Sequence, residues 1–222
     1  MSLARRMALL QWARRASAWI VEDDYDSEFR YVGRPLAALQ GLDADAPGAA
    51  GRVVYVGTLN KVMFPALRVA YAVVPGDLVD PVAAARAATD GAVPALTQAA
   101  LADFVADGHL AAHLRHMRGV YRERRDALLD ACARRLGDRL RLGPAHTGLH
   151  DAGWLAADTD DRVVARRATE RGLDVPPLSR YFAAGGGPPG LVLHFAAASP
   201  ATLRRGVRTL AAALDEARRS ER

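Results

Sequence analysis

The residue whose chemistry stands out first is Lys61, in the stretch GTLNKVMFPALR at residues 57–68. It is the only lysine among the 30 Lys and Arg residues of the chain. A composition rich in Ala, Arg and Gly favours arginine wherever the two cations exchange, but a guanidinium stays protonated and cannot replace a reactive amine. Lys61 is therefore a candidate catalytic amine, and chance survival of a single lysine explains the composition equally well.

Two short apolar segments are placed to deliver other side chains to Lys61. AWIV at 18–21 precedes the acidic run EDDYDSE, and VVYV at 53–56 precedes Gly57. Continuous apolar strands that stop at polar residues are typical of a parallel sheet covered on both faces. A third segment, RVAYAVV at 68–74, follows after a connection too short for a helical crossover, so we expect an antiparallel strand there.

An acid, a phenol, a hydroxyl, an amine and a guanidinium converge if these strands form one sheet. Asp23 and Tyr25 follow the first strand, Thr58 and Lys61 follow the second, and Arg68 begins the third. This set matches pyridoxal phosphate. The amine condenses with the aldehyde and the carboxylate keeps the pyridine nitrogen protonated. The phenol hydrogen-bonds the ring oxygen, and the hydroxyl and guanidinium hold the phosphate.

The rest of the chain predicts an α/β protein in two parts. We expect a large domain over residues 1–137 that ends in a long helix, and a small α+β domain over residues 138–222. The expected helices occupy residues 2–17, 78–90, 95–107, 109–137, 160–171 and 200–218, and a further strand is expected at 190–196.

Composition and the remaining polar residues exclude several other classes of protein. The net charge of +5 comes from arginines mixed with acids, which indicates solvated helix faces rather than a nucleic-acid surface. Cys132 is alone, so a cytoplasmic protein without disulfides is expected. No apolar run approaches the roughly 20 residues of a membrane span. His109, His113 and His116 share a helix face without a further ligand pattern, so no metal site is expected. Asp23 and Asp24 could also form a paired carboxylate for acid–base chemistry or a metal. The sequence between them and Lys61 fits pyridoxal phosphate binding better.

Two long segments, VEDDYDSEFRYVGRPLAALQGLD and VVYVGTLNKVMFPALRVAYAVVP, carry a family resemblance. In this order they resemble the fold-type I aminotransferase-like domain of MocR-type regulators, GntR-related bacterial transcription factors that join a winged helix-turn-helix to that domain. GHLAAHLRHMRGVYRERRDAL and the last strand and helix extend the resemblance over essentially the whole chain. It implies part of the mostly parallel large domain followed by a small α+β domain. It also implies Lys61 as the aldimine lysine, Asp23 at the pyridine nitrogen, Tyr25 at the ring hydroxyl, and Thr58 and Arg68 at the phosphate.

Two departures from the family pattern change what the resemblance implies. The family usually has GTFSK, and here Asn60 replaces a serine that contacts phosphate; an amide still donates a hydrogen bond, so a weakened contact is expected. Active aminotransferases carry an arginine that binds the substrate carboxylate, in an R-L-x-F pattern that here is Val192-Leu193-His194-Phe195. Valine cannot pair with a carboxylate, which argues against efficient transamination unless His194 or Arg180 substitutes.

The resemblance leads to one expected function and two alternatives. It matches about the C-terminal half of such a regulator, without the winged helix, so this chain is not expected to bind DNA by itself. Homodimers are expected, because family members pair subunits across the active site. The expected function is to sense a small amino compound through aldimine exchange at Lys61. The alternatives are a catalytic aminotransferase in which Lys61 also moves a proton, and a non-functional truncated remnant that folds poorly.

Overall fold

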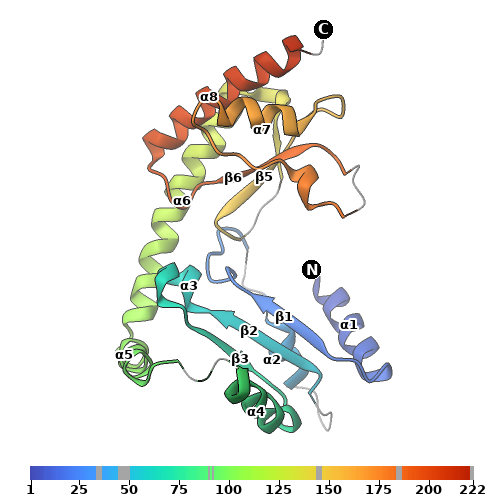
Figure 1. Ribbon diagram of the computed structural model, residues 1–222, viewed down its shortest axis with the longest axis vertical. Helices are drawn as coiled ribbons and strands as arrows, with labels where there is room; N and C mark the ends of the chain where they lie inside the picture. The colour runs from blue at the N-terminus through green and yellow to red at the C-terminus, as the bar shows by residue number, and fades with distance from the viewer. Residues whose placement is uncertain are drawn as a thin grey trace. The chain divides into compact units, whose positions relative to one another are not determined.

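The computed structural model describes residues 1–33, 37–44, 51–89, 91, 93–143, 147–183 and 187–220 (Figure 1). The chain forms two compact units. Unit 1 comprises residues 1–28 and 33–114, and unit 2 comprises residues 29–32 and 115–222. The domain boundary expected at residue 137 follows the long helix, whereas the boundary between the two compact units falls within that helix, between residues 114 and 115.

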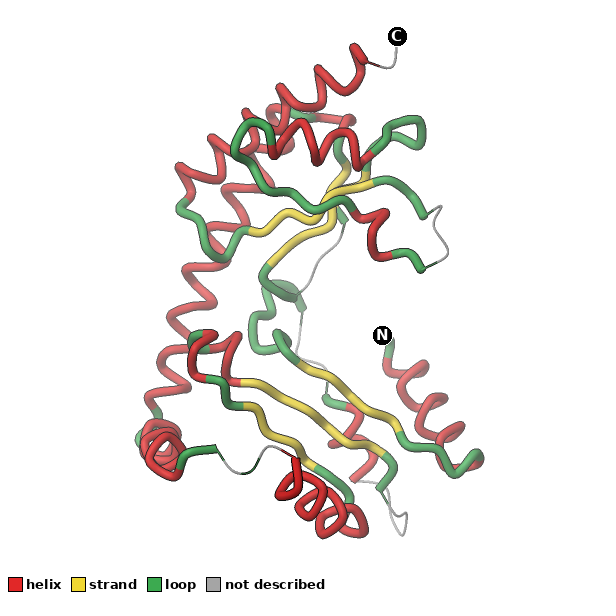
Figure 2. The backbone as a smooth tube through the Cα atoms, viewed as in Figure 1, coloured by secondary structure: helices red, strands yellow, loops and turns green. Residues whose placement is uncertain are grey.

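Unit 1 begins with a helix and builds a small sheet. Its elements are α1 (Leu3–Arg15), β1 (Ile20–Asp24), α2 (Leu39–Ala44), β2 (Val53–Thr58), α3 (Leu59–Val62), the 3-10 helix η1 (Pro65–Leu67), β3 (Ala70–Val73), η2 (Gly76–Leu78), α4 (Val79–Thr89), α5 (Ala95–Ala106) and the first turns of α6 (His109–Arg135). The strands lie in the order β1-β2-β3 (Figure 2). β1 and β2 are parallel and β3 is antiparallel to β2, as the sequence predicts.

The unit 1 sheet has a covered face and an open face. Leu10 of α1 and Leu39 of α2 pack on Val53 of β2, which forms the small core of the covered face. Because side chains alternate along a strand, Val21 and Asp23 of β1 project from the opposite, open face. Val21 is 66% exposed and Asp23 is also exposed. The open face is therefore the accessible one, and it carries Asp23.

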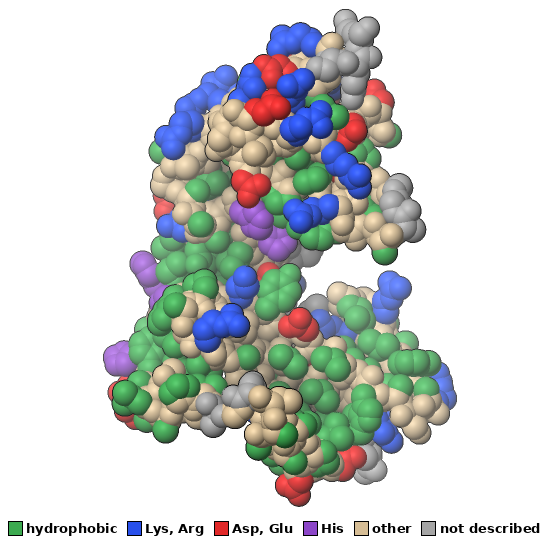
Figure 3. Space-filling model, viewed as in Figure 1, with side chains coloured by type: hydrophobic (Ala, Val, Ile, Leu, Met, Phe, Trp, Pro, Cys, Tyr) green, Lys and Arg blue, Asp and Glu red, His purple; other side chains and the backbone are tan. Residues whose placement is uncertain are grey.

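The helices that follow β3 bury little of their own apolar surface. Neither α4 nor α5 contains a buried residue. Leu96 is 84% exposed and Val105 is 52% exposed, although α5 is rich in Ala, Leu and Val. Hydrophobic side chains accordingly spread over the surface of unit 1 (Figure 3). Unit 1 therefore has only a small hydrophobic core.

Unit 2 is an antiparallel sheet covered by long helices. It contains the rest of α6, η3 (Gly137–Arg139), β4 (Arg141–Leu142), β5 (His150–Trp154), α7 (Asp161–Thr169), η4 (Leu178–Tyr181), β6 (Gly190–His194) and α8 (Pro200–Ser220). The strand order is β4-β5-β6. Leu191 and Leu193 of β6 pack with Val164 of α7 and Leu210 of α8 in one continuous core. Unit 2 thus combines α and β elements, and its bounds differ from the expected 138–222.

A short segment from the N-terminal part of the chain completes unit 2. Phe29 is fully buried and its ring meets the edge of Tyr121 on α6, with ring centroids 4.9 Å apart. Tyr31 donates a hydrogen bond through its hydroxyl to the carbonyl of Gly148 at 2.8 Å. Two aromatic residues of the DSEFRY run are thus part of the unit 2 core.

A buried ion pair ties α6 to the unit 2 sheet. Arg125 donates from Nε and Nη2 to the two carboxylate oxygens of Asp151 at 2.9 and 3.4 Å. Asp151 is 1% exposed. Burial raises the pKa of the Asp151 carboxyl, and the neighbouring Arg125 charge opposes that shift. Such a pair holds its two elements together because a single partner left buried alone is strongly unfavourable.

None of the helices in the described part of the chain combines the length and apolar character that crossing a membrane requires.

Candidate cofactor site

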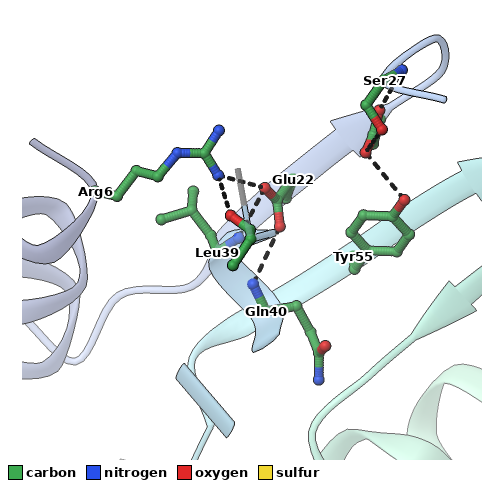
Figure 4. Close-up of polar contacts among 8 residues, drawn as sticks. Arg6, Glu22, Ser27, Leu39, Gln40 and Tyr55 are labelled. Carbon is green, nitrogen blue, oxygen red and sulfur yellow. Dashed lines mark hydrogen bonds and ion pairs between the residues drawn. The ribbon is translucent and has the colours of Figure 1, made fainter. Parts of the chain in front are cut away.

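Strand alternation sorts the acids of β1 into different environments. Glu22, on the covered face, accepts hydrogen bonds from the backbone N–H groups of Leu39 and Gln40 at 2.9 and 3.1 Å (Figure 4). This carboxylate caps the first turn of α2, whose N–H groups have no partner within the helix. Glu22 is therefore used to attach α2 to the sheet.

Asp24, also on the covered face, is used in a second network. It accepts hydrogen bonds from the Ser27 hydroxyl at 2.6 Å and the Tyr55 hydroxyl at 3.1 Å (Figure 4). Asp23 points to the open face, and in the described part of the chain its carboxylate makes no hydrogen bond. Adjacent strand residues face opposite ways, so Asp23 and Asp24 do not form a paired carboxylate. Asp23 is the acid of this run that a ligand can reach.

Tyr25 follows β1 directly and supplies a phenol near Asp23. Its side chain is 44% exposed. Partial burial raises the pKa of the Tyr25 phenol, and the negative charges of Asp26 and Asp23 raise it further. The phenol is thus held in its protonated form at neutral pH. It can donate a hydrogen bond to an oxygen of a bound ligand.

Lys61 lies on a single helical turn that starts where β2 ends. Thr58 is the last residue of β2 and the N-cap of α3, because its hydroxyl oxygen accepts a hydrogen bond from the Asn60 N–H at 3.1 Å. Met63 then leaves helical geometry, with φ −117° and ψ −87°, so α3 stops after Val62. The Lys61 side chain is exposed. Its amine is therefore available to a reagent in solution.

Side-chain hydrogen bonds close residues 59–69, the lysine loop, on itself. The Val69 carbonyl accepts from the Leu59 N–H at 3.0 Å and from the Thr58 hydroxyl at 3.3 Å. The Val69 N–H donates to the side-chain oxygen of Asn60 at 3.0 Å. Thr58 and Asn60, both expected at the phosphate, thus each have a structural task in this loop. Their phosphate contacts stay predictions.

Arg68 is held in an unfavourable backbone conformation next to Val69. Its φ of 53° and ψ of 38° lie in the left-handed region, which costs an L-residue about 1–2 kcal/mol. Such strain persists only where neighbouring contacts impose it, and it clusters at functional sites. The hydrogen bonds of Val69 provide those contacts. The Arg68 side chain is exposed.

Strand register brings these residues to one edge of unit 1. Asp23 pairs with Val56, and Thr58 pairs with Ala70, so Asp23 and Thr58 project from the same face. Lys61 follows Thr58 on α3. The structure thus places Asp23 and Thr58 on adjacent strands and Lys61 on the turn that follows the second of them. Their individual roles stay predictions.

The covered side of the same edge depends on Gly57. Tyr71, its partner on β3, lays its ring where a side chain of residue 57 would be; a Cβ there would lie 2.4 Å from Cζ of the tyrosine. Tyr71 also faces Tyr55, with ring centroids 6.1 Å apart. A side chain at residue 57, near the end of β2, would therefore displace the Tyr71 ring.

The donor set at this edge fits pyridoxal phosphate. Lys61 offers an exposed amine, Asp23 an accessible carboxylate, and Arg68 an exposed guanidinium. Tyr25 offers a phenol that stays protonated. These are the groups that condense with an aldehyde, hold a protonated pyridine nitrogen, bind a phosphate and donate to a ring oxygen.

The remaining residues of interest from the sequence lie in unit 2. Val192 is 7% exposed on β6 and pairs with Ala152. His194 is exposed and pairs with His150, with ring centroids 5.4 Å apart. Arg180 is exposed, and its guanidinium lies over the Tyr181 ring at 5.7 Å.

The three helix-face histidines have different surroundings. His109 and His116 are exposed, and the described residues contain no group of three metal-ligating side chains. His113 behaves differently, because its Nε2 lies 2.9 Å from the carbonyl oxygen of Val62. Sequence reasoning missed this contact, since no local pattern connects residues 51 positions apart.

Comparison with known proteins gives one consistent family. No family model matches the chain. The chain is 40% identical over 213 residues to the "probable rhizopine catabolism regulatory protein MocR" of Rhizobium meliloti. The aligned residues cover 96% of this chain and 42% of that protein.

Solved structures agree on the fold. The multiple substrate aminotransferase of Thermococcus profundus superposes with a TM-score of 0.88 at 28% identity, over 99% of this chain and 53% of that one. LysN, the α-aminoadipate aminotransferase of Thermus thermophilus, was solved with N-(5'-phosphopyridoxyl)-L-leucine. It superposes with a TM-score of 0.87 at 30% identity, over 97% of this chain and 55% of that one.

The length that the chain shares with these proteins sets how far the similarity reaches. The chain spans about half of each matched protein, from 42% of the regulator to 55% of LysN. The fold is thus part of the fold-type I aminotransferase fold, as predicted. The chain belongs to the family of the MocR-type regulators and corresponds to part of their aminotransferase-like domain.

Proposed function

We propose that unit 1 binds pyridoxal phosphate through Lys61, and that the chain is the effector-sensing region of a MocR-type regulator that responds to a small amino compound. One observation carries the proposal. The only lysine of the chain lies on a one-turn helix at the strand edge that also carries Asp23, on the open face of the sheet. LysN, which was solved with a phosphopyridoxyl adduct, supports the cofactor, and the regulatory protein MocR supports the regulatory role.

Each side chain has a defined task in this proposal. When bound, the cofactor supplies an aldehyde that reacts with primary amines and a ring that accepts electrons. Lys61 provides the resident amine. Asp23 would hold the proton on the pyridine nitrogen, Tyr25 would donate to the ring oxygen, and Arg68 would bind the phosphate.

The same arrangement can report an amino compound. With a ligand amine in place of Lys61 at the cofactor aldehyde, the lysine side chain would be free of the cofactor. Lys61 belongs to a single turn whose residues are fixed by side-chain hydrogen bonds. Two arrangements of this turn, with Lys61 engaged or free, differ in their contacts, and a ligand that prefers one shifts the equilibrium between them.

The first experiment measures a covalent adduct at residue 61. Purified protein is incubated with pyridoxal phosphate and reduced with borohydride, and the modified peptide is identified by mass spectrometry. We expect modification of the peptide that contains Lys61, and none at that position in Lys61→Arg. This control keeps the positive charge and the length of the side chain but has no nucleophilic amine.

The result also separates the proposal from a non-functional remnant. The α-amino group reacts with aldehydes too, so only modification at residue 61 counts. A wild-type protein that is folded by circular dichroism and yet shows modification only at the N-terminus would contradict the proposal. Addition of an amine effector should then reduce the trapped Lys61 adduct, because the two amines compete for one aldehyde.

A catalytic aminotransferase is the second candidate. The solved neighbours that superpose over nearly the whole chain are aminotransferases, which favours it. Val192, at the position of the family's carboxylate-binding arginine, argues against it. Formation of a new amino acid from an amino donor and a keto acid separates the two functions, because a sensor binds the amine without turnover.

Two further expectations concern partners. We expect the protein to pair with a second copy, which sedimentation velocity measures, and not to bind duplex DNA by itself, which an electrophoretic shift measures. Both rest on the family resemblance, and we expect the protein to act in the cytoplasm.

A further inference from the structure

We propose that His113 of α6 is the positioning residue of Lys61, and that it acts by fixing the carbonyl of Val62. This inference rests on the proposed function, since it assigns a purpose to the geometry of the reactive amine. It concerns contacts within unit 1 only.

The contact meets an unsatisfied group at the end of α3. The last carbonyls of a helix have no partner within it, and α3 is a single turn, Leu59–Val62. The Val62 carbonyl oxygen lies 2.9 Å from Nε2 of His113, a normal hydrogen-bond length. Val62 is 3% exposed and His113 is half-buried, so water competes poorly for this carbonyl.

The carbonyl partner determines that Nε2 of His113 is the donor. A carbonyl oxygen only accepts hydrogen bonds, so Nε2 of His113 must carry the hydrogen and donate. Glutamine can provide an N–H donor at a similar reach, whereas leucine fills the space without a donor. His113→Gln is thus the conservative substitution, and His113→Leu is the disruptive one.

The two residues that flank Lys61 are both tied by side-chain hydrogen bonds. Asn60, before it, accepts from the Val69 N–H at 3.0 Å. Val62, after it, is bound by His113 at 2.9 Å. The backbone of Lys61 is therefore fixed from both sides while its side chain is exposed. An amine that must meet a ligand in one geometry benefits from such a fixed base, because less freedom is lost on reaction.

The first measurement uses the ligand-free protein. Amide hydrogen exchange of the lysine loop, residues 59–69, is compared among wild type, His113→Leu and His113→Gln. We expect exchange in this loop to rise about tenfold in His113→Leu, because one half-buried hydrogen bond is lost and a carbonyl is left unsatisfied. His113→Gln should stay within about twofold of wild type, since the donor is kept.

The second measurement uses pyridoxal phosphate. The concentration that half-saturates the borohydride-trapped Lys61 adduct should rise about tenfold in His113→Leu and return close to the wild-type value in His113→Gln. His116→Leu, an exposed histidine on the same helix, is the control and should leave both measurements unchanged. Equal far-UV circular dichroism of all variants shows that the helices are intact.

The outcomes separate this inference from the proposed function. If wild type forms no Lys61 adduct, the proposed function fails, and faster loop exchange in His113→Leu alone still supports the hydrogen bond as the loop's anchor. If wild type forms the adduct and His113→Leu matches it in exchange and half-saturation, the inference is overturned. A His113→Gln variant as defective as His113→Leu would also overturn it, since donation would then not be the relevant property.

Discussion

The two units differ sharply in how much core supports them. In the described residues, the unit 2 core holds 19 buried side chains in one cluster, whereas the covered face of unit 1 has a cluster of three. Unit 1 instead exposes apolar helices and a strand face. The unit with the proposed cofactor site is thus the one with less core, and the unit with the larger core carries no expected cofactor group.

The comparison separates the residues that form the larger core from the residues of the proposed cofactor site. Unit 2 is specified by the apolar residues of α7, β6 and α8. Their burial stabilises the unit by roughly 25 cal/mol for each Å² of apolar surface removed from water. Unit 1 is specified by polar contacts: a capped turn, a closed loop and a carboxylate that attaches α2. Stability should therefore respond most to changes in unit 2, and ligand binding to changes in unit 1.

The largest expected effect comes from removing a core aromatic of unit 2. Phe195 is fully buried against Tyr31, so Phe195→Ala should lower the free energy of unfolding of unit 2 by about 4 kcal/mol. Phe64 in unit 1 is 51% exposed, and Phe64→Ala should change stability by less than about 0.5 kcal/mol. Native-state hydrogen exchange, resolved by peptide, measures each unit. Similar losses for both substitutions would break the comparison.

The buried ion pair of unit 2 gives the next effect. Asp151→Leu or Arg125→Met alone should cost about 3 kcal/mol, because each leaves a charge buried without its partner. The double variant should recover most of that loss, since two apolar side chains leave no charge to solvate. A double-mutant cycle measured by urea unfolding gives the coupling, and additive losses would contradict it.

Gly57 tests whether tight packing also matters in unit 1. A Cβ at this position would meet Tyr71 at 2.4 Å, so Gly57→Ala should destabilise the edge of the unit 1 sheet by about 2 kcal/mol. Adding Tyr71→Ala should relieve most of this cost, because it removes the ring. Hydrogen exchange of β2 and β3 peptides measures both, and no rescue by the second substitution would show that the ring is not the cause.

Arg68 separates stability from function within unit 1. Glycine adopts φ of +53° without the steric cost, so Arg68→Gly should be more stable than Arg68→Ala by about 1 kcal/mol. Both should bind pyridoxal phosphate more weakly, because each lacks the guanidinium. Paired unfolding and adduct titrations check this, and equal stability of the two variants would show that the backbone at residue 68 is not strained.

The smallest effect concerns alkaline pH in unit 2. Burial raises the pKa of the Cys132 thiol from 9.0 to about 12, and the nearby Asp151 charge adds to this. A raised pKa stabilises the folded state below the unfolded value, and that stability is lost as the pH rises from 9 towards 12. The loss at pH 9 should be about 0.4 kcal/mol, and it should grow with pH.

Comparison with Cys132→Ala isolates this contribution. Above pH 9, the free energy of unfolding of unit 2 should fall less steeply with pH in the variant than in the wild type. The Tyr55 phenol of unit 1 also has a pKa raised by burial and by Asp24, so unit 1 should respond at higher pH than unit 2. Identical slopes for wild type and variant would contradict the assignment.

The regular elements of the chain were predictable from apolar periodicity. The helices expected at 78–90, 95–107 and 200–218 are present as α4, α5 and α8 with small shifts at their ends. The antiparallel third strand was predicted from the short connection before it. These features depend on local sequence, which is why the sequence alone contains them.

Features set by distant contacts were not predictable in the same way. α2 has only six residues, and its start depends on Glu22 of another element. The sequence selected Asp23 for the cofactor, but it did not reveal the contacts of Glu22 and Asp24, which follow from the covered face of the sheet. The hydrogen bond between His113 and Val62 joins residues 51 positions apart. The site residues were selected by chemical type, and their surroundings came from the fold.

A single lysine and a single cysteine in one chain have a practical consequence. Lys61 is exposed in unit 1, and Cys132 is 1% exposed in unit 2. An amine-selective dye therefore marks unit 1 in folded molecules, while a thiol-selective dye reaches unit 2 only when its core opens. The natural sequence thus already provides two orthogonal handles, one for each unit, without an engineered residue.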